Sequence, residues 1–216
     1  MTASTERKAT NGIVLHSAAG YDWLVWLATF GRERAFREKL LRLARLVPGE
    51  CVLDVGCGTG TLAIAARRVV GAAGRVYGID ASPEMTARAE KKATKAGAEV
   101  VFQNSLAQAL PFPDAQFDVV LSTVMLHHLP RKVREQAAAE MRRVLKPGGR
   151  VLAVDFGGNM ANKKKSLLDH LHRRPGHVAP SDILALLGGA GLKIIESGAV
   201  GIRDLHFVLA AAPCCA

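Results

Sequence analysis

The 216-residue chain has few cysteines, few aromatic residues and no long uninterrupted apolar run. Its four cysteines are too few for a disulfide-dependent scaffold, so we expect a reducing, cytoplasmic environment. No stretch of about 18 apolar residues is free of charge, which predicts that no helix spans a membrane. The first 15 residues lack the apolar segment of a secretory signal. Disulfide-rich, membrane-spanning and secreted classes are therefore not expected.

The composition is that of a globular protein with an excess of positive charge. Apolar residues make up 49% of the chain and charged residues 22%, which excludes collagen, coiled coils and wholesale disorder. The net charge of +10 can attract nucleic acid or an anionic membrane, or it can simply be solvated. Basic residues gather in segments 32–45 and 163–165, and Phe36 is the only aromatic residue among them. A base-stacking surface is therefore not indicated, and we expect no nucleic-acid partner.

Strand-like and helix-like segments alternate along the chain. The apolar patterns predict strands at 51–55, 75–79, 99–103, 117–122, 150–154, 192–200 and 205–211. Helices are predicted at 21–47, 61–70, 82–95, 131–145 and 181–187. This alternation indicates an α/β fold, a doubly wound and mostly parallel sheet covered on both faces. The last two strands have only residues 201–204 between them, which predicts an antiparallel hairpin.

A glycine-rich turn joins the first strand to the next helix, in the sequence Val-Leu-Asp-Val-Gly-Cys-Gly-Thr-Gly at 52–60. Such a turn lets a ligand approach the backbone closely and points amide N–H groups at an anion. The spacing is G-x-G-x-G and not the G-x-G-x-x-G of dinucleotide sites. Asp54 would repel a pyrophosphate but would attract the ammonium of an amino acid. The motif therefore suits a ligand with an amino-acid and a nucleoside part; the alternative is a plain tight turn.

A second carboxylate supports the ligand interpretation. Asp80 ends the second strand, 24 residues after Gly56, where an acidic side chain can accept hydrogen bonds from both ribose hydroxyls. The order and spacing of the strand, the glycines, the helix and the acid that ends the next strand are thus those that a nucleoside site requires.

These motifs together resemble the class I S-adenosylmethionine-dependent methyltransferases. The matching segments are 52–60, 78–82, 110–114, 117–120 and 145–150, and the resemblance covers residues 40–156. It implies a Rossmann-like sheet of seven strands in the order 3-2-1-4-5-7-6, with strand 7 antiparallel, and S-adenosylmethionine as cofactor. We expect one domain over residues 1–216. Its expected parts are a disordered start at 1–12, a helical lead-in at 13–47, a cofactor-binding core at 48–156, a substrate lid at 157–180, and a terminal helix and hairpin at 181–212.

The resemblance also implies a set of cofactor-binding residues. The methionine end would be held by Asp54, Gly56, Cys57, Gly58, Thr59 and Gly60, and the ribose by Asp80 with Ala81 beside it. Met85, Ser105 and Leu106 would flank the adenine, and Ser122 would lie near the transferred methyl group. Many members have an Asp where this chain has Leu106, so adenine recognition would rest on backbone groups, on Asn104 or Ser105, or on apolar contact.

Within that family the chain looks like the ubiquinone/menaquinone biosynthesis C-methyltransferases and their small-molecule relatives. Tyr21-Asp22 and a basic helix leading to Pro48-Gly49 are similar to their N-terminal lead-in. This likeness implies methyl transfer to carbon or oxygen of a small, lipophilic or aromatic acceptor such as a quinol. Trp23 and Trp26 beside the basic helix could close an apolar pocket or make a peripheral membrane contact. The alternative is that the helix packs on the sheet.

Candidate catalytic and substrate-binding residues lie where ligands bind in such sheets, beyond the carboxyl ends of the strands. His127 and His128 are candidate bases, because histidine titrates near neutral pH, and Asp155 is another. The alternatives are a loop with one exposed and one packed histidine, and a cap or turn role for Asp155. Candidate substrate contacts are Tyr21, Trp26, His127, His172 and His177. No metal site is expected, because no ligand pair has zinc spacing.

Other activities stay open at this point. Methylation of an amine, thiol or metalloid is one, and the adjacent Cys214 and Cys215 are the reason for considering it. A nucleic-acid methyltransferase is another, although the segment from Ser122 lacks the Asn/Asp-Pro-Pro-aromatic motif of the amino-methylating enzymes. A non-catalytic cofactor-binding protein is the third. The sequence leaves the oligomeric state open.

Overall fold

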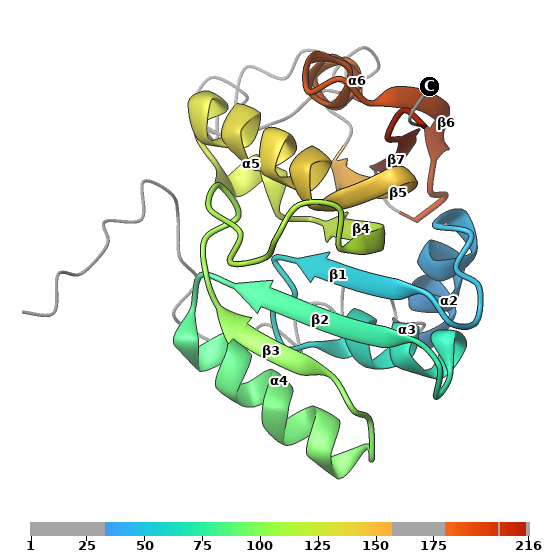
Figure 1. Ribbon diagram of the computed structural model, residues 1–216, viewed down its shortest axis with the longest axis vertical. Helices are drawn as coiled ribbons and strands as arrows, with labels where there is room; N and C mark the ends of the chain where they lie inside the picture. The colour runs from blue at the N-terminus through green and yellow to red at the C-terminus, as the bar shows by residue number, and fades with distance from the viewer. Residues whose placement is uncertain (1–32, 157–179, 203, 215–216) are drawn as a thin grey trace, which may run out of the picture.

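A single seven-stranded sheet organises the part of the chain that the structure describes, residues 33–156, 180–202 and 204–214 of a computed structural model (Figure 1). Its strand order is β3-β2-β1-β4-β5-β7-β6. The strands are β1 (Cys51–Val55), β2 (Arg75–Asp80), β3 (Val101–Asn104), β4 (Phe117–Thr123), β5 (Leu145–Phe156), β6 (Lys193–Ala199) and β7 (Leu205–Ala211). Strand β7 is antiparallel to both β5 and β6, and the other pairs are parallel. The expected sheet order and terminal hairpin are confirmed.

Helices cover both faces of the sheet (Figure 1). They are α2 (Glu33–Leu43), α3 (Thr61–Val70), α4 (Pro83–Lys95), α5 (Arg131–Val144) and α6 (Pro180–Gly189), with a short 3₁₀ turn η1 (Leu126–His128). Helices α2, α3 and α4 share one apolar core with the sheet, and α5 and α6 share a second one on the opposite face. This two-sided cover confirms the doubly wound α/β fold. None of the described helices is long and apolar enough to cross a membrane.

Several element boundaries differ from the sequence predictions. Helix α2 ends at Leu43 and not at 47, because Arg45 adopts a left-handed φ of 54°, and Val47 is then 51% exposed. The third strand lies at Val101–Asn104, two residues later at its start than expected. Residues 146–149, which separate the predicted helix at 131–145 from the predicted strand at 150–154, form an irregular part of β5, where the register with β4 shifts. Residues 21, 26, 172 and 177, expected to contact substrate, lie outside the described residues.

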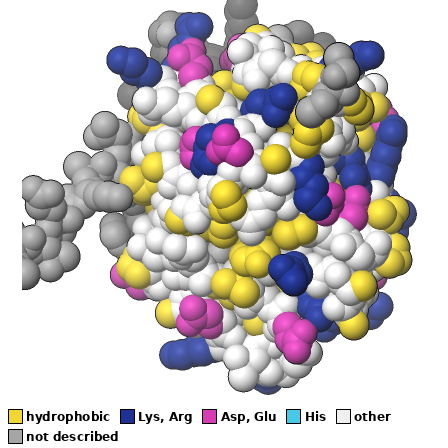
Figure 2. All heavy atoms as spheres, in the orientation of Figure 1, with side chains coloured by type: hydrophobic (Ala, Val, Ile, Leu, Met, Phe, Trp, Pro, Cys, Tyr) yellow, Lys and Arg dark blue, Asp and Glu magenta, His cyan; other side chains and the backbone are white. Residues whose placement is uncertain are grey.

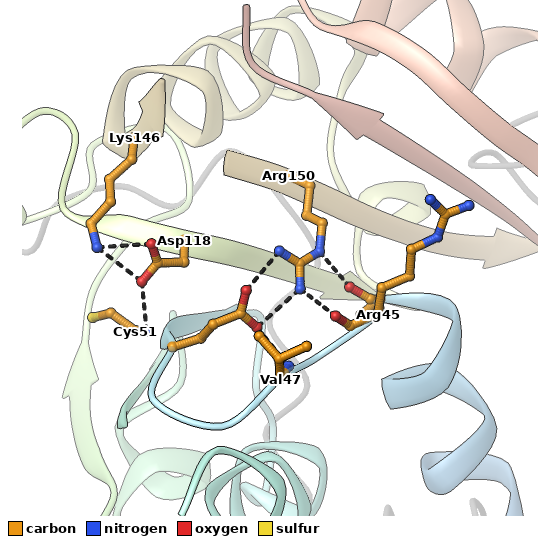
Figure 3. A network of polar contacts seen from close by, with 8 residues as sticks. Arg45, Val47, Cys51, Asp118, Lys146 and Arg150 are labelled. Carbon is orange, nitrogen blue, oxygen red and sulfur yellow. Dashed lines mark hydrogen bonds and ion pairs between the residues drawn. The ribbon is translucent and has the colours of Figure 1, made fainter. Parts of the chain in front are cut away.

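Arg150 anchors the link between α2 and β1 to the sheet (Figure 3). From β5 it donates hydrogen bonds to the carbonyl oxygens of Ala44 and Arg45, each at 2.6 Å. Its guanidinium also forms a two-pronged ion pair with Glu50, at 2.8 and 2.9 Å. Both side chains are largely buried, 17% and 12% exposed. One arginine therefore satisfies two carbonyl groups at the end of α2 and the carboxylate just before β1.

We expect Arg150→Gln to lower the free energy of unfolding by about 2–4 kcal/mol, because it leaves a largely buried Glu50 without its cation. Urea denaturation measures the difference. Arg131→Gln is the matched control: Arg131 pairs with Glu135 on the surface at 89% exposure, so its loss should cost about 0.5 kcal/mol or less. Equal losses in the two variants would contradict the anchoring role.

Candidate functional site

The loop between β1 and α3 has a backbone that glycine adopts far more readily than other residues. Gly56, Gly58 and Gly60 have φ values of 74°, 52° and 75°, in the left-handed region. Space is also short: a Cβ atom at Gly60 would lie 2.6 Å from the Phe102 ring and 2.8 Å from Ala89. The N–H groups of Gly56 and Cys57 both donate to the Ile79 carbonyl oxygen at 2.9 Å, which ties the loop to β2.

Asp80, at the end of β2, is bound to the same loop. One carboxylate oxygen accepts the Gly58 N–H at 2.9 Å, and the other accepts the Ser82 N–H at 2.9 Å. Burial raises the pKa of Asp80, while these backbone N–H groups oppose that rise. An ionised carboxylate has about four acceptor positions, so both oxygens can still accept from a ligand.

Asp54 lies buried beneath the loop, with 2% of its surface exposed. Its Oδ2 atom has no hydrogen-bond partner within the described residues. Burial raises the pKa of Asp54 to about 7; the charge of Arg37 opposes the rise and the charge of Asp80 adds to it. A buried acceptor without a partner is costly. The site therefore suits a ligand that brings a cationic donor to Asp54.

Sequence reasoning missed Arg37. This residue is on α2, its side chain is 15% exposed, and it forms an ion pair with Glu33. In the sequence it was one of several basic residues in segment 32–45. Its charge acts on Asp54 only because α2 packs against the sheet near β1, a long-range contact that no local pattern reveals. An amino-acid ligand carries both an ammonium and a carboxylate, and Asp54 with Arg37 offers one charge of each sign.

Most of the other predicted cofactor residues lie around this loop. The N–H of Ser105 and the side-chain amide of Asn104 both donate to the Asp80 carbonyl oxygen, at 3.0 and 2.9 Å, which holds Ser105 and Leu106 beside β2. Ala81 is half-buried next to Asp80. Cys57, Thr59 and Met85 are buried, with 8%, 3% and 3% of their surface exposed.

Ser122 does not join this group. It pairs with Val55 in the parallel register, so it lies on the α5 side of the sheet, whereas Asp54 lies on the α3 side. Ser122 is 1% exposed, and its hydroxyl has no hydrogen-bond partner in the described ranges.

His127 and Asp155 meet at the carboxyl ends of β4 and β5. The His127 Nδ1 atom lies 2.7 Å from Asp155 Oδ1, and the His127 backbone N–H donates to Asp155 Oδ2 at 3.0 Å. Asp155 is fully buried, and its Oδ1 atom also accepts the Phe156 N–H at 2.8 Å. The His127 side chain is 19% exposed, so one part of the ring reaches the surface of the site. Asp155, within β5, thus orients the His127 ring and also accepts a backbone N–H of the 3₁₀ turn η1.

A strained residue turns the chain toward this pair. Val124 has a φ of 53°, which is rare for a β-branched side chain, and its N–H donates to the Val154 carbonyl oxygen at 2.7 Å. Beyond it, η1 brings His127 and His128 together, with ring centroids 3.8 Å apart. Both histidines are half-buried, so the expected split into one exposed and one packed ring is wrong. Burial lowers the pKa of His128, and the neighbouring His127 lowers it further.

Comparisons with known proteins identify the family and the fold of this domain. Residues 52–149 match the family model described as a methyltransferase domain. A solved S-adenosylmethionine-dependent methyltransferase from Aquifex aeolicus is 25% identical, with a TM-score of 0.73 over 91% of this chain and 99% of that one. The [4+2]-cyclase SpnF has a TM-score of 0.72 at 21% identity, over 85% and 82% of the two chains, which shows the shared fold alone.

The fold, the loop and the family match define a methyltransferase domain of the class I, S-adenosylmethionine-dependent type. Among curated proteins, the ubiquinone/menaquinone biosynthesis C-methyltransferase UbiE of Burkholderia mallei is 37% identical over 144 residues. That match covers 66% of this chain and 58% of the relative's length. The residues present fit the cofactor: Asp54 has a buried oxygen in need of a donor, and Asp80 places a carboxylate beside the glycine loop.

We expect the pKa of Asp54 to make stability pH-dependent. An acid whose pKa is raised on folding stabilises the folded state at low pH, and this contribution is lost as pH rises through about 7. Asp54→Asn removes that loss. Its stability relative to the wild type should therefore grow by about 2–3 kcal/mol between pH 5 and pH 8. Urea denaturation of the ligand-free protein at both pH values measures this difference.

The control is Asp114→Asn, at a side chain that is 77% exposed. Its stability relative to the wild type should be nearly the same at the two pH values. If the difference in unfolding free energy between Asp54→Asn and the wild type were the same at both pH values, Asp54 would be ionised at no cost in the folded protein.

Proposed function

We propose that the chain transfers a methyl group from S-adenosylmethionine to carbon or oxygen of a small, lipophilic or aromatic acceptor, a quinol or a related phenol. The observation that carries the proposal is the hydrogen bond between His127 and Asp155, at the same edge of the sheet as the glycine loop. The similarity to UbiE supports the acceptor class.

The chain's own residues would hold the two ends of the cofactor. Asp54 would accept from the ammonium, Arg37 would face the carboxylate, and Asp80 would accept from the ribose hydroxyls. Ser105 and Leu106, held beside Asp80, would flank the adenine. When bound, S-adenosylmethionine supplies a methyl group activated by a positively charged sulfur. The protein then contributes proximity, orientation and a dry site.

His127 would act as the base. A phenol or an acidic carbon centre must lose a proton as its new bond to carbon forms. With the Nδ1 proton donated to Asp155, the Nε2 atom of His127 is left as an acceptor. The buried carboxylate of Asp155 would then stabilise the imidazolium that proton transfer creates. In this scheme His127 is the catalytic residue and Asp155 is a positioning residue.

The remaining substrate-side assignments are predictions. Tyr21, Trp26, His172 and His177 lie outside the described residues, and so do residues 157–179 of the lid expected at 157–180. A cytoplasmic location, with peripheral contact to a membrane, would suit a lipophilic acceptor. The proposed division into lead-in, core, lid and terminal hairpin stays a prediction as well.

The acceptor class is tested with a methyl-labelled donor and a panel of acceptors. The panel holds quinols, simple phenols, amines, thiols, arsenite, RNA and DNA, and the measurement is label transferred to each. Transfer to quinols or phenols alone is the expected result. Transfer to a thiol, arsenite or nucleic acid would contradict the proposed quinol or phenol acceptor and identify another acceptor class. Cofactor binding without transfer to any acceptor would favour a non-catalytic protein or another reaction, as SpnF, a cyclase with this fold, illustrates.

We expect His127→Gln to lower kcat for methyl transfer to a phenol acceptor by about 10²–10⁴-fold, because general-base catalysis contributes that much. Asp155→Asn should lower kcat as well, because the asparagine amide cannot stabilise an imidazolium. Cofactor affinity, measured by calorimetry, should change by about twofold or less in both variants.

His128→Gln is the matched control on the same turn and should keep most of the wild-type kcat. An unchanged kcat in His127→Gln, or equal losses in His127→Gln and His128→Gln, would remove His127 from the role of base.

A further inference from the structure

A groove on the α2 side of the molecule combines an apolar floor with a basic rim. It runs between α2, α3 and α4. Leu46, Ile64, Ala65 and Val69 supply apolar surface, and Val69 is 38% exposed. The basic side chains along it are Arg34, Arg37, Arg42, Arg68 and Lys92. No role in the proposed chemistry uses Arg42, Arg68 or Val69.

The positive charge of this groove is only partly neutralised. Its two acids, Glu33 and Glu38, are already paired with Arg37 and Arg34. Arg42 and Arg68 are exposed and have no ion-pair partner within the described ranges. Figure 2 shows one face of the molecule, on which Lys and Arg side chains lie beside Asp and Glu at several places. The groove therefore suits a ligand that is anionic and apolar at once.

The apolar floor distinguishes between anionic partners. Nucleic acid would cover the floor with charged phosphates and would find no aromatic side chain in the groove to stack on. The surface of an anionic bilayer presents phosphates and, just beneath them, acyl chains. Phosphates would contact Arg42 and Arg68, and acyl chains would cover Val69 and Leu46.

The geometry points to this groove as a docking surface for anionic phospholipid membranes. The inference rests on the proposed function in one respect: a lipophilic acceptor would be dissolved in that membrane. Arg37 belongs to the groove and also acts on Asp54, so one end of the groove reaches the cofactor side of the sheet. Arg68 and Val69 lie at the other end of α3, beside the start of β1. Arg42, Arg68 and Val69 are then membrane-contact residues, separate from the groups that handle the methyl group.

The test is sedimentation of the full chain with vesicles of phosphatidylcholine, alone or mixed with phosphatidylglycerol, at physiological salt. We expect binding to the anionic vesicles only. The double variant Arg42→Glu/Arg68→Glu should lower the partition coefficient at least tenfold, because each basic residue near an anionic surface contributes appreciably. Val69→Ser should weaken binding at constant charge. The neutral pair Arg42→Gln/Arg68→Gln keeps the test valid if the reversed charges impair folding.

The matched control is Arg131→Glu/Lys132→Glu on α5, which makes the same change in net charge on the opposite face. It should bind within about threefold of the wild type. Equal losses in the two double variants would show general electrostatic attraction and overturn the proposal. So would equal binding to neutral and anionic vesicles, or no binding, or tighter binding to an acidic peptide or to RNA than to vesicles. Vesicle binding needs neither cofactor nor methyl transfer. The vesicle experiment therefore tests membrane docking even if the proposed function fails.

Discussion

The site depends on the backbone of residues 56–60. Three left-handed glycines turn the chain sharply at the end of β1, and two N–H groups of the loop share the Ile79 carbonyl oxygen of β2. Asp80 then accepts the Gly58 N–H, so the end of β2 and the loop form one rigid corner. Side chains at these positions would meet Phe102, Ala89 or Met125. Because the corner is held by backbone groups, Asp54 and Asp80 keep their relative places without a ligand.

The parallel register extends this corner into a larger site. Strands β1, β2, β4 and β5 all end at the same edge, so the residues that follow them gather there. Asp54 and Asp80 come from β1 and β2, whereas Asp155 ends β5 and orients His127 after β4. Two carboxylates thus serve the cofactor side and a third serves the proposed base. Asp54 and Asp155 differ in their hydrogen bonding. One carboxylate oxygen of Asp54 lacks a partner, whereas both oxygens of Asp155 have one.

The sequence predicted the alternating strands and helices and the glycine loop, because each leaves a local pattern, whereas the order of the strands in the sheet was implied by the family resemblance. Apolar strands between helices, glycines at alternate positions and an acid at the end of β2 are all readable along the chain. The pairing of His127 with Asp155 joins residues 28 positions apart, so the sequence could propose both but not their contact. Arg37 was missed for the same reason. The sequence did not show that Ser122 lies on the opposite face of the sheet from Asp54, because a register of one residue decides which face a side chain occupies.

The most direct test of the account is calorimetric titration of the purified full chain with S-adenosylhomocysteine. The account predicts micromolar binding that Asp80→Asn weakens at least tenfold, because one ionised acceptor between the loop and the ribose is lost. Asp114→Asn, at an exposed carboxylate far along the chain, should bind as the wild type does. No binding by the wild type, or equal affinity in Asp80→Asn, would contradict the claim that the corner formed by the glycine loop and Asp80 holds the cofactor.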